Sequence, residues 1–163
     1  MGNAWIVSDY RIVKNSDEEI KDLDTYNLKT IAIIDKKFEP AVNGLKIQPD
    51  SNAKITLSDY KPNKLTYKYK ISTDQIAVFS EIYYEKGWIA TIDGKPADIF
   101  RSDYILRALR LPAGEHQVVF EFKPVAYYTG EKISFASSLT LILLAVGGIV
   151  YAIFRKLSPK QSV

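Results

Sequence analysis

Alternation of apolar and polar residues dominates the middle of the chain and predicts β-strands. In residues 64–71, KLTYKYKI, every second residue is apolar, and the residues between them are three lysines and one threonine. This period of two predicts a half-buried strand with a lysine-rich face toward solvent. We expect residues 54–60 to form a preceding strand, joined to it by a turn at 61–63. The almost continuous apolar run at 75–84 is typical of a central strand.

Turn-forming residues divide the next part of the chain into further strands. Asp93-Gly94 lies between strand-like runs at 88–92 and 95–101, and this dipeptide suits the positive φ angles of a type I′ hairpin turn. Pro112-Ala113-Gly114 separates two more such runs, which we expect to form a second hairpin over 104–123. Strands at intervals of about ten residues predict a mainly β fold, an antiparallel β-sandwich of jelly-roll or immunoglobulin-like kind.

The N-terminal part has a different pattern, which predicts a small strand–helix–strand unit followed by a connecting loop. Residues 4–14, as one or two strands, and residues 28–34 are the strand-like segments of this unit. Between them, Ser16 and Glu19 have the S-x-x-E spacing of a capping box, which predicts a short helix over about 17–26. Prolines and an Asn-Gly pair in the residues that follow indicate a loop with turns.

An uncharged apolar run follows the β-rich part and divides the chain. Residues 133–154 contain no charged residue and no proline, and as a helix they reach about 33 Å, enough to cross a hydrocarbon core of about 30 Å. We interpret the run as a transmembrane helix, because buried helices of soluble proteins rarely stay uncharged for so long. The sequence thus predicts one body, in which 1–52 packs with a sandwich over 53–132, then this helix and a basic tail over 155–163.

Small and aromatic residues of the predicted helix indicate its partners. Gly148 and Ala152 form a small-xxx-small pair, which allows another transmembrane helix to approach closely. Tyr127 and Tyr128 before the run, and Tyr151 near its far end, are placed to lie at the two membrane interfaces, where tyrosine is favoured. The expected partners are therefore the lipid bilayer and other transmembrane helices.

Composition excludes several classes of function. The net charge of +3 comes from the last nine residues, since residues 1–132 hold 19 basic and 19 acidic residues, and this balance gives no support to a nucleic-acid partner. The absence of cysteine excludes disulfides, zinc ribbons, iron–sulfur clusters and thiol catalysis. A single histidine, His116, excludes a multi-histidine metal site within one chain. The sequence predicts no metal site and no cofactor.

Several short motifs carry a resemblance to a known family. They are Phe79-Ser80-Glu81, Tyr84, Gly87-Trp88, Asp93-Gly94, Arg107-Ala108, Pro112-Ala113-Gly114, His116, Phe122-x-Pro124 and, near the start, Gly2 to Trp5. Together with the apolar helix that follows, these residues resemble the C-terminal end of the YfhO-like family of bacterial multi-spanning membrane proteins. The form found in Bacteroidetes-type bacteria is the most similar.

The resemblance implies a location and a chemistry. The body would lie on the outer face of the bacterial cytoplasmic (inner) membrane, followed by the last membrane helix. Family members are regarded as resembling glycosyltransferases that use lipid-linked sugars. Their catalytic carboxylates lie in loops of an N-terminal membrane region that has no counterpart in this sequence, so no catalytic residue is carried over. We therefore expect the chain to be either the C-terminal part of a longer protein or a truncated relative of the family.

Aromatic and charged side chains of the strand region supply candidate contact residues. Aromatic rings offer flat apolar faces to a sugar, and core packing is the alternative role for them. The candidate glycan contacts are Tyr83, Tyr84, Trp88 and Tyr104. Glu81 and Arg107 both lie in apolar strands, where a charge needs a partner, and are candidates for a buried ion pair.

Other titratable residues invite a catalytic interpretation, but we favour a structural one. His116 is a candidate general base or sugar contact, yet it directly follows a turn, where it is expected to cap the apolar face of its strand. A glycosidase needs two carboxyl groups roughly 5–10 Å apart. Asp93 is explained by its turn, and Asp98 and Asp103 lie near strand ends, where solvated carboxylates are common. We expect no catalytic residue in this chain.

These patterns predict a non-catalytic, membrane-anchored extracytoplasmic β-domain, the C-terminal part of a YfhO-like protein of glycosyltransferase type. The alternative is a stand-alone, membrane-held carbohydrate-binding module, and either would have a glycan or lipid-linked sugar as partner. Arg155, Lys156 and Lys160 after the helix outnumber Lys123 and Lys132 before it, which favours a cytoplasmic tail and an outside body. A tail-anchored chain with its body in the cytoplasm is the opposite arrangement.

Overall fold

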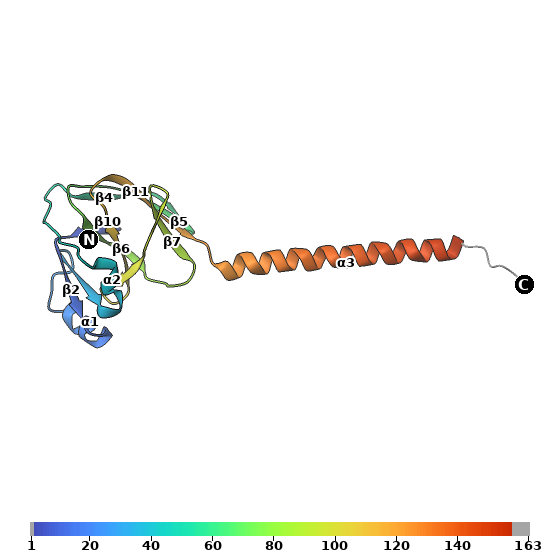
Figure 1. The fold of residues 1–163 in the computed structure, drawn as a ribbon, viewed down its shortest axis with the longest axis horizontal. Coiled ribbons are helices and arrows are strands. Elements are labelled where there is room, and N and C mark those ends of the chain that lie inside the picture. The colour runs from blue at the N-terminus through green and yellow to red at the C-terminus, as the bar shows by residue number, and fades with distance from the viewer. Residues whose placement is uncertain (1, 158–163) are drawn as a thin grey trace, which may run out of the picture. The chain divides into compact units, whose positions relative to one another are not determined.

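The computed structural model describes residues 2–157, without the side chains at 125, 126, 128 and 155–157. It consists of two compact units, a body that ends at Lys123 and a helical segment that begins at Pro124 (Figure 1). Most of the predicted basic tail lies outside the described residues.

Two antiparallel sheets form the body (Figure 1). The four-stranded sheet has the order β1 (Ala4–Val7), β6 (Gln75–Ile82), β10 (Leu106–Leu111) and β9 (Phe100–Ser102). The five-stranded sheet has the order β4 (Lys54–Lys61), β5 (Lys64–Ile71), β11 (Gly114–Phe122), β7 (Trp88–Ile92) and β8 (Lys95–Ala97). The prediction of a mainly β, antiparallel fold is confirmed.

The main core lies between the two sheets and is centred on aromatic rings. Phe79 of β6 makes edge-on contacts with Tyr67 of β5 and Phe120 of β11, with ring centroids 4.9 and 4.8 Å apart. In β5 all four apolar residues of the alternating pattern are buried, and the three lysines point away from the core. Thr66 departs from the pattern, because it is buried too.

The predicted strand–helix–strand unit is present. β2 (Asp9–Val13) pairs in parallel with β3 (Ile31–Asp35), and α1 (Ser16–Leu23) connects them. Parallel neighbours need a crossover connection, which the helix provides. The first strand-like segment divides at Ser8, so that β1 joins the four-stranded sheet and β2 joins this unit.

Local details of this N-terminal part correct the prediction. The helix cap is Asn15, whose side chain accepts a hydrogen bond from the Glu18 amide at 3.0 Å, while the Glu18 carboxylate accepts one from the Lys14 amide. The capping residues therefore lie one position before Ser16 and Glu19. The predicted loop contains the 3-10 helix η1 (Lys36–Phe38) and the short helix α2 (Glu39–Val42), which has proline in its first turn, where proline is favoured.

A second core lies on the other face of the four-stranded sheet. Ile76 and Val78 of β6 pack there with residues of β3 and α2, whereas Ala77 and Phe79 face the core between the sheets. All four side chains are fully buried. Because both faces of β6 are covered, the strand is apolar at consecutive positions, which explains the continuous run that predicted a central strand.

The two predicted hairpins have different outcomes. β7 and β8 pair around Asp93-Gly94, whose φ angles of 49° and 80° are both positive, so the first hairpin is confirmed. The second is wrong, because β10 and β11 belong to opposite sheets and Pro112-Ala113-Gly114 connects the sheets across the core. The segment 95–101 likewise divides, with β8 in one sheet and β9 in the other. Turn residues mark a reversal of the chain without specifying which sheet the next strand joins.

The second unit is one long helix, α3 (Val125–Leu157). It contains a 26-residue apolar stretch, Thr129–Phe154, none of which is buried and which is long enough to cross a membrane. The helix begins earlier than the predicted span of 133–154, so that Tyr127 lies within its first turn. One C-terminal helix that could span a membrane is thus confirmed.

Candidate functional site

Three of the four candidate glycan-contact residues line one pocket of about 260 Å³. Tyr83 and Tyr84 follow the last residue of β6, and Trp88 is the first residue of β7. Glu85 and Asp98 add two carboxylates to the lining. The remaining lining residues, which make a largely apolar wall, are Ile89, Ala90, Pro96, Ala97 and Ile99.

Contacts outside the pocket hold its aromatic side chains in place. The Tyr83 amide donates to the Ile105 carbonyl at 2.7 Å, and the Tyr83 ring packs edge-on against Phe38 at 5.5 Å. The Trp88 ring lies 5.3 Å from the ring of Phe122. Burial raises the pKa of the Tyr83 hydroxyl, so at neutral pH this group is protonated and able to donate a hydrogen bond.

Arg107 lies behind Trp88 in the core. Its guanidinium is 4.3 Å from the centroid of the Trp88 ring and 5.1 Å from that of Phe120, and it donates to the Ile82 carbonyl from Nε and Nη2. The distance from Nη2 to Glu81 Oε2 is 4.0 Å, with Arg107 buried and Glu81 partly exposed. Burial lowers the pKa of Arg107, and Glu81 opposes that shift. The arginine thus fixes the position of the tryptophan ring.

The fourth aromatic candidate, Tyr104, is not among the residues that line this pocket. Its ring lies 5.6 Å from the guanidinium of Arg101, and its backbone has a φ angle of 69°. The structure therefore brings Tyr83, Tyr84 and Trp88 together and places Tyr104 elsewhere.

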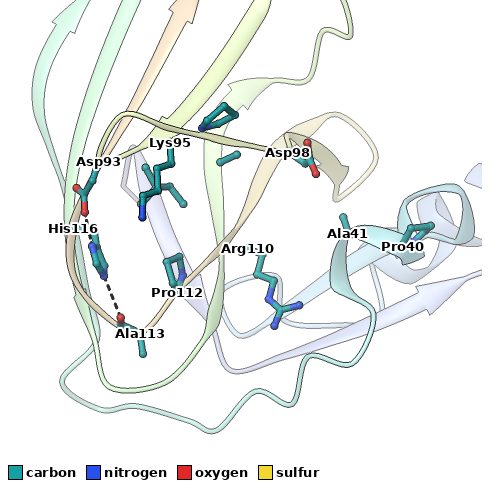
Figure 2. Close-up of a pocket in the computed structure, with 12 residues that line it drawn as sticks. Pro40, Ala41, Asp93, Lys95, Asp98, Arg110, Pro112, Ala113 and His116 are labelled. Carbon is teal, nitrogen blue, oxygen red and sulfur yellow. Dashed lines mark hydrogen bonds and ion pairs between the residues drawn. The ribbon is translucent and has the colours of Figure 1, made fainter.

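A second pocket of about 590 Å³ contains most of the titratable residues that we considered for catalysis. Figure 2 shows Asp93, His116 and Ala113 along one side of it, with Asp98, Ala41 and Pro40 on the other. The distance from His116 Nδ1 to Asp93 Oδ2 is 2.6 Å, and His116 Nε2 is 3.1 Å from the Ala113 carbonyl oxygen. Both ring nitrogens face an acceptor, and the hydrogen bond to Asp93 is the main reason that the pKa of His116 is raised. An imidazole held in this way is poorly suited to act as a general base.

Comparisons with known proteins decide the family. The family model described as bacterial membrane protein YfhO matches residues 18–134. The chain belongs to the YfhO family. It is 30% identical over 122 residues to the "Uncharacterized protein YfhO" of Bacillus subtilis (strain 168), an alignment that covers 75% of this chain and 13% of that relative. No solved structure matches the chain.

Among the described residues of this YfhO-family body, two of the three buried charged ones lie where the strand–helix–strand unit meets β9, and the third is Arg107. Glu19 is fully buried, and its Oε2 is 2.8 Å from Nη2 of Arg101, while its Oε1 accepts from the Tyr104 amide at 2.8 Å. Asp103 is 4% exposed and accepts from the Ile33 amide at 2.8 Å. The expectation of a solvated carboxylate at Asp103 was wrong, because β3 covers this strand end.

Sequence reasoning missed the pairing of Glu19 with Arg101. Glu19 is the last of three consecutive acidic residues, and nothing in the sequence distinguishes the one that is buried. Burial raises the pKa of both Glu19 and Asp103, the latter to about 6. Their hydrogen bonds to the Tyr104 and Ile33 amides support a structural role, since they connect segments far apart in the sequence. In the described part of the chain, no group of three or more histidine or acidic side chains is placed to hold a metal ion.

The predicted interface tyrosines belong to α3. Tyr127 and Tyr151 are both exposed, and their separation of 24 residues corresponds to about 36 Å along a helix, close to the thickness of the hydrocarbon core. The side chain of Tyr128 lies outside the described residues. A Cβ atom added at Gly148 would meet nothing within 4 Å, and Ala152 is exposed, so this face of the helix is accessible to another helix.

Proposed function

We propose that this chain is a non-catalytic extracytoplasmic β-domain of a YfhO-family protein of glycosyltransferase type, and that it binds a glycan or the sugar of a lipid-linked donor or acceptor. One observation carries the proposal. Tyr83, Tyr84 and Trp88 converge on a single pocket that also contains two carboxylates. Apolar ring faces and hydrogen-bond acceptors together suit a sugar, which has apolar C–H faces and hydroxyl donors.

The size and support of the pocket favour binding of one sugar ring. Its volume of about 260 Å³ is just below the range of about 300–1,000 Å³ typical of sites for drug-sized ligands. Arg107 and Phe122 hold Trp88 from behind, so the ring is already positioned before a ligand arrives. A preorganised aromatic face binds with a smaller entropic cost than a mobile one.

A binding role, rather than a catalytic one, agrees with the placement of the titratable groups. The carboxyl groups with raised pKa values, Glu19 and Asp103, bond to backbone amides away from both pockets. His116 is engaged by Asp93 and Ala113. The family resemblance implies that any catalytic carboxylates lie outside this chain, which supports a role for the chain in sugar recognition.

A glycan array probed with the full chain in nanodiscs tests this proposal. We expect at least one bacterial glycan to bind, and Tyr84→Ala or Trp88→Ala to weaken that binding by about tenfold or more, equivalent to about 1.4 kcal/mol. Tyr60→Ala is the matched control, since Tyr60 is an exposed tyrosine that does not line the pocket, and it should bind normally. Absence of binding to every glycan, or equal losses in all three variants, would contradict the proposal.

The side of the membrane on which the body lies requires a separate experiment. The chain contains no cysteine, so cysteines introduced at Ser51 and Ser162 are the only ones in this part of the protein. In intact spheroplasts we expect an impermeant thiol reagent to label the exposed Ser51→Cys in the body and to leave Ser162→Cys in the tail unlabelled. The reverse labelling would place the body in the cytoplasm.

A further inference from the structure

One end of the sandwich is defined by the place where β11 finishes, and we call it the β11 end. The Phe122 amide donates to the Asn63 carbonyl at 2.9 Å, and the Lys123 amide donates to the Gly87 carbonyl at 2.5 Å. The four-stranded sheet reaches the same end, since Tyr83 and Tyr84 after β6 line one pocket with Trp88 and Ile89 of β7, and the Tyr83 amide donates to the Ile105 carbonyl before β10. The β11 end therefore consists of the turn at 61–63, the loop from 83 to 87, the loop before β10, and the strand ends that flank them.

Exposed apolar side chains of the body gather at the β11 end. Among the described body residues, six large apolar side chains are 44% to 66% exposed, and only Ile20, on α1, lies elsewhere. The other five are Tyr60, Ile82, Tyr84, Ile89 and Ile105. Their positions follow from register, since Ile82 pairs with Leu106 at the start of β10 and Ile89 pairs with Glu121 near the end of β11. A concentration of this kind marks a contact surface.

Charge does not select the partner of this surface. The basic residues at this end are Lys61, Lys64, Lys86, Arg107 and Lys123, and the acidic residues are Asp59, Glu81, Glu85, Asp103 and Glu121. Several of them pair with each other, since Lys64 and Lys123 both contact Glu121 and Lys61 contacts Asp59. Five positive and five negative charges cancel, so the attraction to a partner comes from apolar contact.

Chain connectivity indicates that the partner of this apolar surface is the lipid bilayer. Lys123 is the last residue of the body, and Thr129 is the first residue of the stretch that could span a membrane. Six residues reach at most about 22 Å when fully extended. This short connection keeps the β11 end close to the lipid surface. The effective concentration of lipid at this end is therefore high, whereas a soluble partner would have to bind from solution.

We propose that the β11 end of the body rests on the membrane surface, with Ile82 and Ile105 at the boundary between headgroups and acyl chains. Tyr60 and Tyr84 lie at headgroup level, where an aromatic ring with a polar tip is favoured. Tyr84 and Ile89 also line the aromatic pocket, so this contact brings the pocket to the level at which the sugar of a lipid-linked molecule is carried.

Fluorescence quenching by lipid tests the contact in the full chain. Ile82, Ile105 and Ile20 are replaced one at a time by cysteine, labelled with an environment-sensitive fluorophore, and reconstituted into phosphatidylcholine vesicles at low protein density. All three residues are exposed isoleucines, so Ile20 is the matched control, and circular dichroism confirms the fold of each variant. We expect phospholipids with a nitroxide near the glycerol backbone to quench probes at 82 and 105 several-fold more strongly than at 20.

Three outcomes would overturn the proposal. Equal quenching at all three positions means that the β11 end has no preferred contact with lipid. A probe at 82 or 105 that becomes shielded from water without being quenched by lipid means that a protein surface covers this end instead. Because the charges balance, higher salt should leave the quenching unchanged, and its loss in salt would also contradict an apolar contact.

Discussion

Individual carboxyl groups in the body ionise according to what surrounds them. Asp103 is enclosed by β3 and β9, and its burial outweighs the hydrogen bonds from the Ile33 amide and Ser102 hydroxyl, so that its pKa rises to about 6. Asp93 has the opposite environment, since it is exposed and accepts from the Gln117 amide and pairs with His116, which lowers its pKa. The two environments can be tested separately, through the pH dependence of the stability of the body for Asp103 and through the titration of His116 for Asp93.

Asp103 should make the body less stable as pH rises. Its pKa is raised from an ordinary value of 3.8 to about 6, so its stabilising contribution is complete below pH 3.8 and is lost as pH passes through 6. The expected loss is on the order of 2–3 kcal/mol. Urea unfolding of the full chain in nanodiscs, followed by the fluorescence of Trp5 and Trp88, measures it.

Asp103→Asn is the variant that tests this assignment. It keeps the shape of the side chain and removes the titration, so its free energy of unfolding should fall less between pH 4 and 6 than that of the natural chain. Part of the slope should remain, because the pKa of Glu19 is raised too. If the free energy of unfolding changes equally with pH in the two proteins, Asp103 does not cause the loss of stability.

His116 should be protonated at a pH where a free histidine is largely neutral. Because it is the only histidine, its ring gives a single titrating set of NMR signals. We expect a pKa above 6.5, since hydrogen bonds to Asp93 and to the Ala113 carbonyl favour the charged ring. Asp93→Asn should lower that pKa, and an unchanged titration would show that the contact is absent in solution.

At the scale of elements, the β7–β8 hairpin depends on two consecutive residues with positive φ. Gly94 has a φ of 80°, and a Cβ atom there would meet nothing within 4 Å, so backbone conformation alone limits substitution. We expect Gly94→Val to destabilise the body by about 1 kcal/mol or more, because β-branched residues fit this region poorly.

Gly94→Asn is the matched control for that prediction, since asparagine adopts positive φ more readily than other residues with a side chain. Chemical unfolding should rank the natural chain as most stable, the asparagine variant next and the valine variant last. Equal stability of the valine and asparagine variants would show that the turn conformation does not limit the hairpin.

At the scale of the whole body, the Glu19–Arg101 pair connects the strand–helix–strand unit to the four-stranded sheet. Removing one partner of a fully buried pair costs about 3 kcal/mol or more. We expect Glu19→Gln to cost less than this, on the order of 2 kcal/mol, because Arg101 is partly exposed and keeps its contact with Asp35 at 3.4 Å. Asp22→Asn on the same helix, which removes an exposed contact with Arg11, should cost less than about 1 kcal/mol. Similar losses of unfolding free energy in both variants would show that the pair does not hold the strand–helix–strand unit against the four-stranded sheet.

The sequence by itself determined the features that depend on neighbouring residues. The period of two in residues 64–71, the turn at Asp93-Gly94 and the uncharged run at 133–154 each act within one segment, and each indicated the element that is found. The three glycan candidates next to one another in sequence also met in one pocket, because the end of β6 and the start of β7 lie only a few residues apart.

Tertiary structure alone decided which strands share a sheet and which charges share a site. Pro112-Ala113-Gly114 signals a reversal, but only packing across the core sends β10 and β11 to opposite sheets. Glu19 and Arg101 are 82 residues apart, and Asp103 is 70 residues from Ile33, so no local pattern relates them. Burial by distant segments sets the ionisation of such groups, and a sequence pattern has no access to that burial before the chain is folded.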